Sequence, residues 1–407
     1  MLKNLLDQLI KVGRLTVIWP NGRSCAFGEV VANDPRLDVI VRLRGALTPW
    51  KLALNPDLHL GEAYMHGNLV LEQGTLRDLL EICGRNELQN QQQTRLARAV
   101  GRLSRGLQQQ NSLAAARRNA VRHYDLPYAH YHQFLDEDLQ YSCAYFPKSG
   151  YSLDEAQIAK KRHIAAKLQL KPSQRVLDIG CGWGGLALSL ARVEEVDVIG
   201  VTLSPEQLAV AQQRAKSLGL DRRVKFELRD YRELAGKFDR IVSVGMFEHV
   251  GTPHYTEFFS VLRELLADKG LALLHSIGRM QGPGVTSAWI RKYIFPGGYV
   301  PALSQVMPAI ERSGLWLTDL EILRLHYAET LRLWRTRFMA RRDEAKAMYD
   351  ERFRRMWEFY LTVSEMSFRF GGFMVFQAQL ARQVDAVPVS RDYMFEQEQI
   401  GRPMVAV

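Results

Sequence analysis

Two periods of apolar residues alternate along the middle of the chain. Short apolar runs, typical of buried strands, are separated by longer segments in which apolar residues recur every three or four positions, as on one face of a helix. Strands identified in this way cover residues 175–177, 196–201, 224–228, 240–244 and 270–275, and helices cover 186–192, 205–218 and 255–266. This alternation indicates an α/β, doubly wound (Rossmann-like) domain around a parallel sheet.

The first part of the chain predicts a smaller α+β domain in residues 1–85. Residues 15–19 and 39–43 have the apolar pattern of strands, and residues 74–82 have that of a helix. Residues 86–120 are rich in Gln and Arg, which is typical of a linker and equally of a docking helix. The catalytic domain then covers residues 121–387, and residues 388–407 form a tail without a clear pattern.

A basic amphipathic helix is predicted for residues 329–359, where Leu, Trp, Phe and Met are mixed with many Arg residues. Such a helix can lie on a membrane surface. It can equally pack against the sheet and turn its basic face to solvent, and the pattern does not decide between the two arrangements.

The net charge of +10 indicates an anionic partner, either nucleic acid or an anionic membrane surface. No nucleic-acid-binding motif accompanies the charge, and the four cysteines show no metal-ligand spacing, so we expect neither nucleic acid nor a bound metal. The first residues lack the apolar core of a signal peptide, and no apolar run is long enough to span a bilayer. We therefore expect a cytoplasmic protein that is at most peripheral to a membrane.

The segment Val176-Leu-Asp-Ile-Gly-Cys-Gly-Trp-Gly-Gly185 indicates a strand, a tight glycine turn and the start of a helix. Its acid, Asp178, precedes Gly180 and Gly182, whereas an acid follows the glycines in the dinucleotide fingerprint; the Lys-Ser/Thr of a P-loop is also absent. An acid beside such a turn suits a ligand that joins a cationic amino-acid group to an adenosine, such as S-adenosylmethionine.

Two later strand ends offer further contacts for such a ligand. Thr202 stands where a carboxylate commonly holds the ribose hydroxyls, so hydroxyl and amide groups would have to replace that carboxylate. Ser204 is the predicted N-cap of the following helix, which puts Gln207 in the first turn. Asp230 and Tyr231 follow the next strand and offer an acceptor and a ring suited to adenine, although Asp230 could equally cap a turn.

Four segments, taken in order, resemble the cyclopropane-fatty-acyl-phospholipid synthases and the related cyclopropane mycolic acid synthases. One is the glycine turn, and the others are Tyr141-Ser-Cys-Ala-Tyr-Phe146, Val242-Ser-Val-Gly-Met-Phe-Glu-His-Val-Gly251 and Leu274-His-Ser-Ile-Gly278. The resemblance covers about residues 120–380, and Gly61-Glu-Ala-Tyr-Met65 extends it to the N-terminal domain. It implies a class I S-adenosylmethionine methyltransferase domain, preceded by a domain that binds lipid or forms a homodimer.

The resemblance also implies roles for individual residues. Those that match the family's bicarbonate site are Cys143, Glu248, His275, Ile277 and Tyr327. Those that match its S-adenosylmethionine contacts are Tyr141, Ser142, Gly180, Gly182, Thr202, Gln207, Asp230 and Tyr231. Asp178 belongs to the same glycine motif, either as a ligand contact or as a residue that orients the turn.

The implied reaction transfers a methylene group from S-adenosylmethionine to the cis double bond of unsaturated acyl chains in membrane phospholipids. Attack of the alkene on the sulfonium methyl gives a carbocation, and bound bicarbonate removes a proton so that the cyclopropane ring closes. Aromatic faces stabilise a cation, and the candidates are Tyr327, Phe247, Trp289 and Tyr293. Loss of a different proton would give a methyl- or methylene-branched chain, and the sequence does not separate these products.

Because the implied substrate lies in a bilayer, we expect basic residues to bind the enzyme peripherally to the inner face of the membrane. A lipid-binding protein without activity would be expected to lack Glu248, His275 or Tyr327, and all three are present. The Asn/Asp-Pro-Pro-Tyr/Phe loop of nucleic-acid methyltransferases is absent. The chain departs from the family at Ser364, where a cysteine is usual, which argues against a thiol nucleophile there and leaves room for a different substrate or product.

Overall fold

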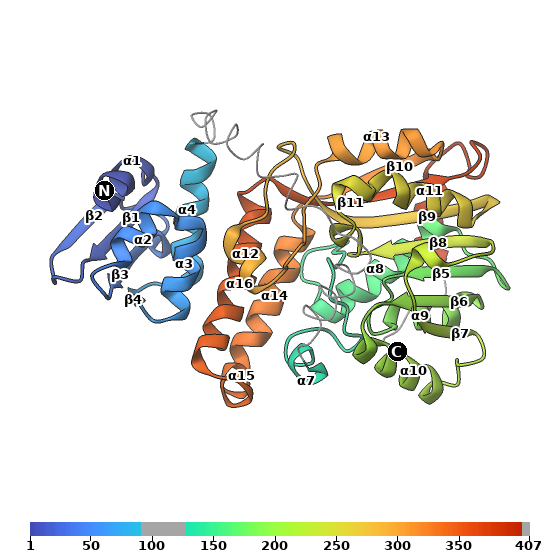
Figure 1. Ribbon diagram of the computed structural model, residues 1–407, viewed down its shortest axis with the longest axis horizontal. Coiled ribbons are helices and arrows are strands. Elements are labelled where there is room, and N and C mark those ends of the chain that lie inside the picture. Colours follow the sequence, from blue (N-terminus) through green and yellow to red (C-terminus); the bar gives the residue numbers. More distant parts are fainter. Residues whose placement is uncertain (91–126, 401–407) are drawn as a thin grey trace. The chain divides into compact units, whose positions relative to one another are not determined.

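The computed structural model describes residues 1–90 and 127–400. These residues form two compact units, each assembled from separate stretches of the chain (Figure 1). The first unit contains residues 1–90, 285–296 and 331–373, and the second contains residues 127–284, 297–330 and 374–400.

A seven-stranded sheet forms the centre of the second unit, in the order β10-β11-β9-β8-β5-β6-β7 (Figure 1). The strands from β9 to β7 pair in parallel, whereas β10 and β11 are antiparallel to each other at one edge. The predicted doubly wound α/β fold is confirmed, but the sheet is mixed, because the edge pair comes from chain beyond the last predicted strand. The bounds are β5 (Arg175–Ile179), β6 (Asp197–Thr202), β7 (Val224–Leu228), β8 (Phe238–Val244), β9 (Leu266–Arg279), β10 (Trp316–Leu323) and β11 (Phe373–Ala381).

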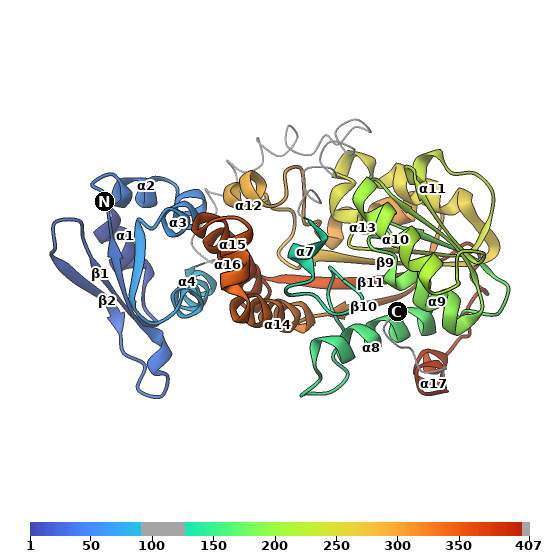
Figure 2. The same ribbon diagram turned by 90° about the horizontal axis from the view of Figure 1, so that it is seen from below.

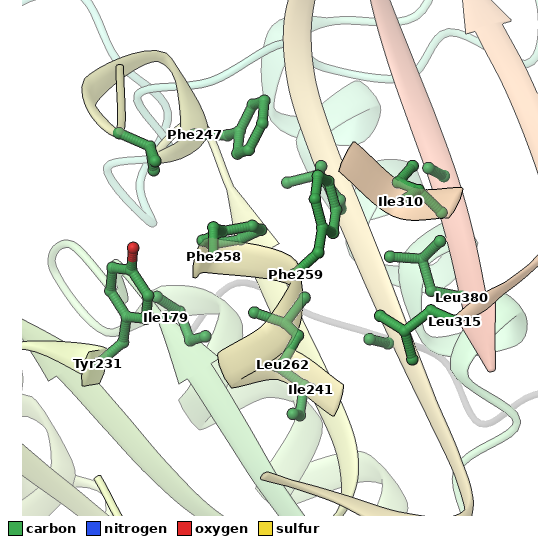
Figure 3. Packing of buried hydrophobic residues seen from close by; sticks show 14 of the residues in the cluster. Ile179, Tyr231, Ile241, Phe247, Phe258, Phe259, Leu262, Ile310, Leu315 and Leu380 are labelled. Carbon is green, nitrogen blue, oxygen red and sulfur yellow. The ribbon is translucent and has the colours of Figure 1, made fainter. Parts of the chain in front are cut away.

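Helices cover both faces of this sheet (Figure 2). Helices α8, α9 and α10 pack against strand residues such as Val176 and Val242, and α11 and α13 pack on the opposite face against Leu177 and Ile241 (Figure 3). Neighbouring strand residues alternate between the two cores because strand side chains point to opposite faces. The bounds are α8 (Leu153–Leu168), α9 (Gly185–Glu194), α10 (Pro205–Ser217), α11 (Tyr255–Leu265) and α13 (Leu303–Ser313).

Shorter elements complete the second unit. One of them, α17, lies in the segment for which the sequence predicted only a tail, and it packs against α8. The bounds are α7 (Tyr128–Tyr131), η2 (Tyr231–Glu233), η3 (Phe247–His249), η4 (Thr252–His254) and α17 (Asp392–Ile400).

A four-stranded sheet lies in the first unit, in the order β2-β1-β3-β4. Strand β1 is parallel to β3 and antiparallel to β2, and β4 is antiparallel to β3. The predicted strands are β1 and β3, whereas β2 and β4 were not predicted because each buries few residues and shows no apolar alternation. The bounds are α1 (Leu2–Leu9), β1 (Gly13–Ile18), β2 (Ser24–Glu29), η1 (Pro35–Leu37), β3 (Asp38–Leu43), α2 (Thr48–Leu54), α3 (Pro56–Met65), β4 (Leu69–Gln73) and α4 (Leu76–Asn90).

Segments from later in the chain complete the first unit. The sequence placed residues 285–296 and 331–373 in the catalytic domain, whereas the structure groups them with the N-terminal residues. The later segments pack closely against α3 at Gly61. A Cβ at this position would lie 2.4 Å from Nε1 of Trp289 and 2.8 Å from the ring of Phe359. Glycine therefore lets two rings pack directly on the backbone of α3.

Residues 329–359 are helical for most of their length, as predicted, but they belong to three helices instead of one. Tyr349 leaves the helical conformation, and the side chain of Asp350 accepts a hydrogen bond from the N–H of Phe353 at 2.6 Å, which starts a new helix. The helices in these later segments are α12 (Ala288–Tyr293), α15 (Arg342–Met348), α16 (Glu351–Arg369) and most of α14 (His326–Ala340), whose first five residues belong to the second unit.

Helix α4 continues to Asn90, into the segment predicted as a linker, and the rest of that linker lies outside the described residues. Within residues 1–90 and 127–400, none of the helices combines the length and the apolar character needed to cross a membrane.

Candidate active site

A cavity of about 180 Å³ lies at the carboxyl ends of the parallel strands β5 to β8. This edge is where ligands bind in open α/β sheets. Every residue predicted to contact the cofactor lines the cavity: Tyr141, Ser142, Asp178, Gly180, Gly182, Thr202, Gln207, Asp230 and Tyr231. The fold thus brings together residues that are widely separated in the sequence.

The glycine turn after β5 brings bare backbone to the cavity. Gly180 has a φ of +81°, and a Cβ there would lie 2.9 Å from that of Met246, so a side chain would be strained and crowded. Its N–H donates to the carbonyl of Val201 at 2.9 Å, which joins the turn to the end of β6. At Gly182, with a φ of +54°, no atom lies within 4 Å of the Cβ position, which leaves open space beside the backbone.

Asp178, in strand β5, is a buried acid that lines the cavity. Its Oδ2 atom forms no hydrogen bond with the described residues. Burial raises the pKa of this carboxyl to about 7, an effect that the nearby Lys160 ammonium opposes. A buried carboxylate oxygen without a donor is costly, so a ligand that brings an ammonium or N–H group would stabilise it. This favours a ligand contact over a role confined to the turn.

Thr202 and Gln207 form one polar pair at the end of β6. The hydroxyl of Thr202 donates to Oε1 of Gln207 at 2.9 Å and accepts from the N–H of Ser204 at 3.2 Å. The hydroxyl of Ser204 accepts from the N–H of Gln207 at 3.3 Å, which confirms the predicted N-cap of α10. A hydroxyl and an amide, already connected to each other, therefore stand where a carboxylate is common.

Asp230 both caps a turn and lines the cavity. Its Oδ1 accepts from Nε of Arg232 at 2.9 Å and from the same residue's backbone N–H at 3.0 Å, while Oδ2 accepts from Nη2 at 2.8 Å. The capping role that the sequence left open is therefore present, and a carboxylate retains lone pairs for a further donor. The neighbouring Tyr231 packs edge-to-face on Phe258, with ring centroids 5.4 Å apart (Figure 3).

Lys160 on α8 is a residue of this site that the sequence reasoning missed. It is fully buried, and its Nζ donates to Oγ of Ser142 at 2.8 Å and to Oε1 of Gln140 at 2.7 Å, both of which line the cavity. Burial lowers the pKa of this ammonium to about 8. Lys160 thereby holds the segment around Ser142 in place. A lysine within a polar helical pattern predicts a solvent-facing residue, so the sequence carried no signal for this role.

A second group of polar residues comes from η3, just after β8, and from strands β9 and β11; we call Glu248, His275, Ile277 and Gln377 the Glu248 cluster. Oε1 of Glu248 accepts from the N–H of Ile277 at 2.7 Å. Oε2 is buried and forms no hydrogen bond with the described residues. Burial raises the pKa of Glu248 to about 7, although the hydrogen bond from Ile277 opposes the shift. The resemblance implied that the main chain of Ile277 contacts a ligand, but its N–H already donates to Glu248.

His275 is buried in β9 and is hydrogen-bonded to Gln377 of β11, with 3.1 Å between Nδ1 and Nε2 of the amide. Oε1 of the same amide accepts from Nζ of Lys167 at 2.8 Å. Burial lowers the pKa of His275 well below its usual range, and the positive charges of Lys160 and Lys167 act in the same direction. His275 is therefore neutral near pH 7. Gln377 and Lys167 were not predicted from the sequence.

Cys143 and Tyr327 belong to the predicted bicarbonate set, but no hydrogen bond among the described residues joins them to the Glu248 cluster. Burial raises the pKa of the Cys143 thiol, and the main-chain N–H and carbonyl of this residue form no hydrogen bond with the described residues. The N–H of the next residue, Ala144, donates to the hydroxyl of Thr330 at 3.0 Å. Thr330 lies one turn beyond Tyr327 on α14, which anchors the Cys143 segment to this helix.

Of the rings proposed to face a cation, Phe247 belongs to a core of the second unit, and Trp289 and Tyr293 belong to the first unit. Phe247 is fully buried and stacks on Tyr255 at 4.4 Å between centroids, so it belongs to the core beneath α11 (Figure 3). Trp289 is 1 % exposed and packs against Phe359 in the first unit. Ser364, where the family usually has cysteine, lies in α16 of the same unit.

The sequence profile of the family described as mycolic acid cyclopropane synthetase matches residues 111–378, which include the cavity and the Glu248 cluster. Cyclopropane-fatty-acyl-phospholipid synthase from Escherichia coli is 44 % identical over 263 residues, which cover 65 % of this chain and 67 % of that protein. Tuberculostearic acid methyltransferase from Mycobacterium tuberculosis is 36 % identical over 367 residues, which cover 86 % of this chain and 85 % of that protein.

Solved structures also match. A cyclopropane synthase from Mycobacterium tuberculosis gives a TM-score of 0.62 at 34 % identity, covering 65 % of this chain and 98 % of that one. A mycolic acid cyclopropane synthase complexed with SAH and CTAB gives a TM-score of 0.62 at 34 % identity, covering 65 % and 97 %.

Proposed function

This chain belongs to the mycolic acid cyclopropane synthetase family and is an S-adenosylmethionine-dependent methyltransferase, and we propose that its substrates are unsaturated acyl chains of membrane phospholipids. The reaction transfers a methylene group to the cis double bond and closes a cyclopropane ring. The phospholipid is taken from the name of the Escherichia coli relative, with which this chain is 44 % identical.

The observation that carries the proposal is that the cavity and the Glu248 cluster each contain a buried carboxylate oxygen without a hydrogen-bond partner among the described residues. The cavity collects all the predicted cofactor residues and leaves Oδ2 of Asp178 without a donor, which suits the ammonium of the cofactor's amino-acid portion. Glu248 leaves a second buried carboxylate oxygen without a partner. These two oxygens lie at the edge of one sheet where the site is proposed, and each can take up a polar group that the protein itself does not supply.

The residues fit a small oxyanion in the role of base. Bound S-adenosylmethionine supplies an electrophilic methyl, and bound bicarbonate would supply a base without placing a permanently charged side chain in an apolar site. Neutral His275 can donate its ring N–H to the anion, and the main-chain N–H of Cys143 has no partner among the described residues and can do the same. Oε2 of Glu248 can accept a hydrogen bond from the O–H of bicarbonate. Tyr327, 8 % exposed near the start of α14, supplies a hydroxyl and a ring in this proposal.

The order of events follows from the chemistry of the alkene. The double bond attacks the sulfonium methyl, a new carbon–carbon bond forms, and the carbon–sulfur bond breaks. The positive charge then resides on the acyl chain, and loss of one proton from the transferred methyl lets the ring close. Glu248 and His275 hold the group that takes this proton.

A methyl- or methylene-branched product is the second candidate. The relative whose alignment covers 86 % of this chain is named a tuberculostearic acid methyltransferase, whereas the Escherichia coli synthase aligns over 65 %. Both products share the first bond-forming step and differ only in which proton leaves. The position of the base relative to the transferred methyl therefore decides the product.

For contact with the membrane we propose the exposed face of α2 in the first unit, on a protein that lies in the cytoplasm at the inner face. Leu47, Trp50 and Leu54 follow helical spacing along one face and are 67 %, 58 % and 74 % exposed. Lys51 lies between them and lines a cavity of about 430 Å³ beside this helix, together with Lys292, whose ammonium is paired with Glu62. An aromatic and two aliphatic side chains flanked by cations suit an anionic phospholipid surface.

Release of S-adenosylhomocysteine tests the proposed substrate. Purified protein with S-adenosylmethionine should release it on vesicles of phospholipids with cis-monounsaturated chains and not on matched vesicles with saturated chains. Equal release on both, or release only with free unsaturated fatty acids, would contradict the phospholipid assignment.

Vesicle co-sedimentation tests the membrane surface. Trp50→Ala should weaken binding to anionic vesicles by about fivefold or more, and high salt should weaken it further. Trp316→Ala is the matched control, because Trp316 is 54 % exposed and lies on strand β10. Equal effects of the two substitutions would contradict a role for α2. The homodimer implied by the resemblance stays a prediction, which sedimentation velocity would check.

A further inference from the structure

Gln377 lies at the centre of a buried polar relay that ends on His275. The relay begins with Lys167 of α8, passes through the amide of Gln377 in β11, and reaches the imidazole in β9. Lys167, Gln377 and His275 are all nearly or fully buried. Their hydrogen bonds therefore form in a low-dielectric environment, where the direction of each bond matters.

The direction of the relay is determined by the lysine. An ammonium can only donate, so the atom of Gln377 that lies 2.8 Å from Nζ of Lys167 must be the carbonyl oxygen. The amide nitrogen is then the atom that lies 3.1 Å from Nδ1 of His275, and it donates to that ring nitrogen. The oxygen and nitrogen of an isolated glutamine amide could be exchanged by a 180° rotation. For Gln377 this rotation would place its NH₂ group against the ammonium of Lys167, so the assignment is fixed.

Lys167 is itself held in one orientation. Its ammonium contacts the carboxylate of Glu321 and lies 3.8 Å from the carboxylate of Asp319, both on β10. Side chains from three elements, α8, β10 and β11, thus define the direction of the relay before it reaches His275, and none of them was identified from the sequence.

From this geometry we propose that Gln377 is a positioning residue: by donating to Nδ1 it makes Nε2 the nitrogen of His275 that carries the proton. Nε2 forms no hydrogen bond with the described residues, so its N–H is left to bind the anion that serves as base. The inference rests on the proposed function only in the use made of this N–H, since the proton's position follows from the relay itself.

The neighbouring charges favour the same neutral form. Lys160, Lys167 and His163 lie near the His275 ring and disfavour an imidazolium, while Glu321 has the opposite effect. A neutral ring with one defined N–H can donate to an oxyanion through Nε2. The opposite tautomer would present a lone pair to that anion and repel it.

Nitrogen-15 NMR of protein with labelled histidine measures the proton's position directly. In the unaltered protein we expect the His275 signals, assigned by their loss in His275→Ala, to show an unprotonated Nδ1 and a protonated Nε2. A neutral ring protonated at Nδ1, or an imidazolium at pH 7, would overturn the inference. This readout needs no lipid, so it stands or fails separately from the proposed substrate.

Gln377→Glu reverses the relay with little change in shape. The carboxylate can still pair with Lys167, but its second oxygen can only accept a hydrogen bond from a protonated Nδ1, and in a neutral ring this moves the proton from Nε2 to Nδ1. We expect the NMR signals to exchange and the turnover number to fall by about 100-fold or more, with the affinity for S-adenosylhomocysteine unchanged.

Gln379→Glu is the matched control, because Gln379 is equally buried two residues along β11 and its amide binds the carbonyl of Lys167 and the hydroxyl of Tyr393. This control should leave the His275 signals in place. Exchanged signals without a loss of turnover, or equal losses in both variants with unmoved signals, would each contradict a positioning role for Gln377.

Discussion

The cavity at the ends of β5 to β8 and the Glu248 cluster lie along the same edge of one sheet, but they differ in how far apart in the sequence their hydrogen-bond partners lie. In the cavity, Thr202 is bound to Gln207, and Asp230 to Arg232, so most groups are held before a ligand arrives. In the cluster, Glu248 is bound to Ile277 and His275 to Gln377, which lie 29 and 102 residues away in the sequence. Each site also leaves one buried carboxylate oxygen without a partner among the described residues, Oδ2 of Asp178 in the cavity and Oε2 of Glu248 in the cluster.

The difference in location explains part of this contrast. The cavity is formed by the ends of β5 to β7 and by the glycine turn, so the backbone conformation of these segments largely positions its lining residues. The cluster combines β8 and β9 with β11, so its arrangement depends on side chains from elements distant in the sequence. Changes in the cluster should therefore affect the chemical step, and changes in the cavity should affect cofactor binding.

The largest effect is expected for His275→Ala. Loss of a group that holds the base should lower the turnover number by about 100-fold or more, because this is the usual contribution of acid–base catalysis. Calorimetry should show unchanged affinity for S-adenosylhomocysteine, since His275 does not line the cavity. A loss of affinity as large as the loss of turnover would assign His275 to the cofactor site and remove the contrast.

An intermediate effect is expected for Asp178→Asn, which removes the negative charge from the cavity with little change in shape. Affinity for S-adenosylhomocysteine should fall by about tenfold or more, because a charge-assisted hydrogen bond to the ligand's ammonium is lost. The ligand 5′-methylthioadenosine lacks the amino-acid portion and should bind both proteins alike. If both ligands lost affinity equally, the role of Asp178 would be to hold the conformation of the glycine turn and not to contact the ligand's ammonium.

The smallest effect is expected in the pH dependence of stability at Glu248. Burial raises the pKa of this carboxyl from its ordinary 4.5 to about 7, so the folded protein binds the proton more tightly than the unfolded chain. Its contribution to stability is fully present below pH 4.5 and is lost as the pH rises through 7. The melting temperature of the unaltered protein should therefore decline relative to Glu248→Gln across this range. A constant difference would show that Glu248 is not buried in this way.

Much of the cavity could be predicted from the sequence because it follows from local rules. A strand that ends at Asp178 and runs into glycines predicts a turn, and the carboxyl ends of parallel strands must share one edge, which brings Thr202 and Asp230 together with it. Ser204 at the start of a helix is an equally local signal. The resemblance contributed Glu248 and His275, which no spacing rule connects.

The rest depended on contacts that the local pattern does not contain. Lys160 and Lys167 look like the solvent-facing residues of an ordinary helix, yet both are buried, because α8 packs against the sheet and polar groups receive their ammonium ends. Gln377 lies in a strand that was not predicted. In the first unit, the contact of Gly61 with Trp289 joins segments more than two hundred residues apart, so no local pattern could indicate it.

The central claim is that the transferred carbon ends in a ring on a phospholipid acyl chain, and the structure of the product tests it most directly. Vesicles with cis-monounsaturated chains would be incubated with the protein, S-adenosylmethionine and bicarbonate, and the fatty acids examined by mass spectrometry and proton NMR. The account predicts a mass gain of one CH₂ with upfield ring-methylene protons and loss of the olefinic signals. The same mass gain with olefinic or branched-methyl protons, and no ring signals, would contradict it.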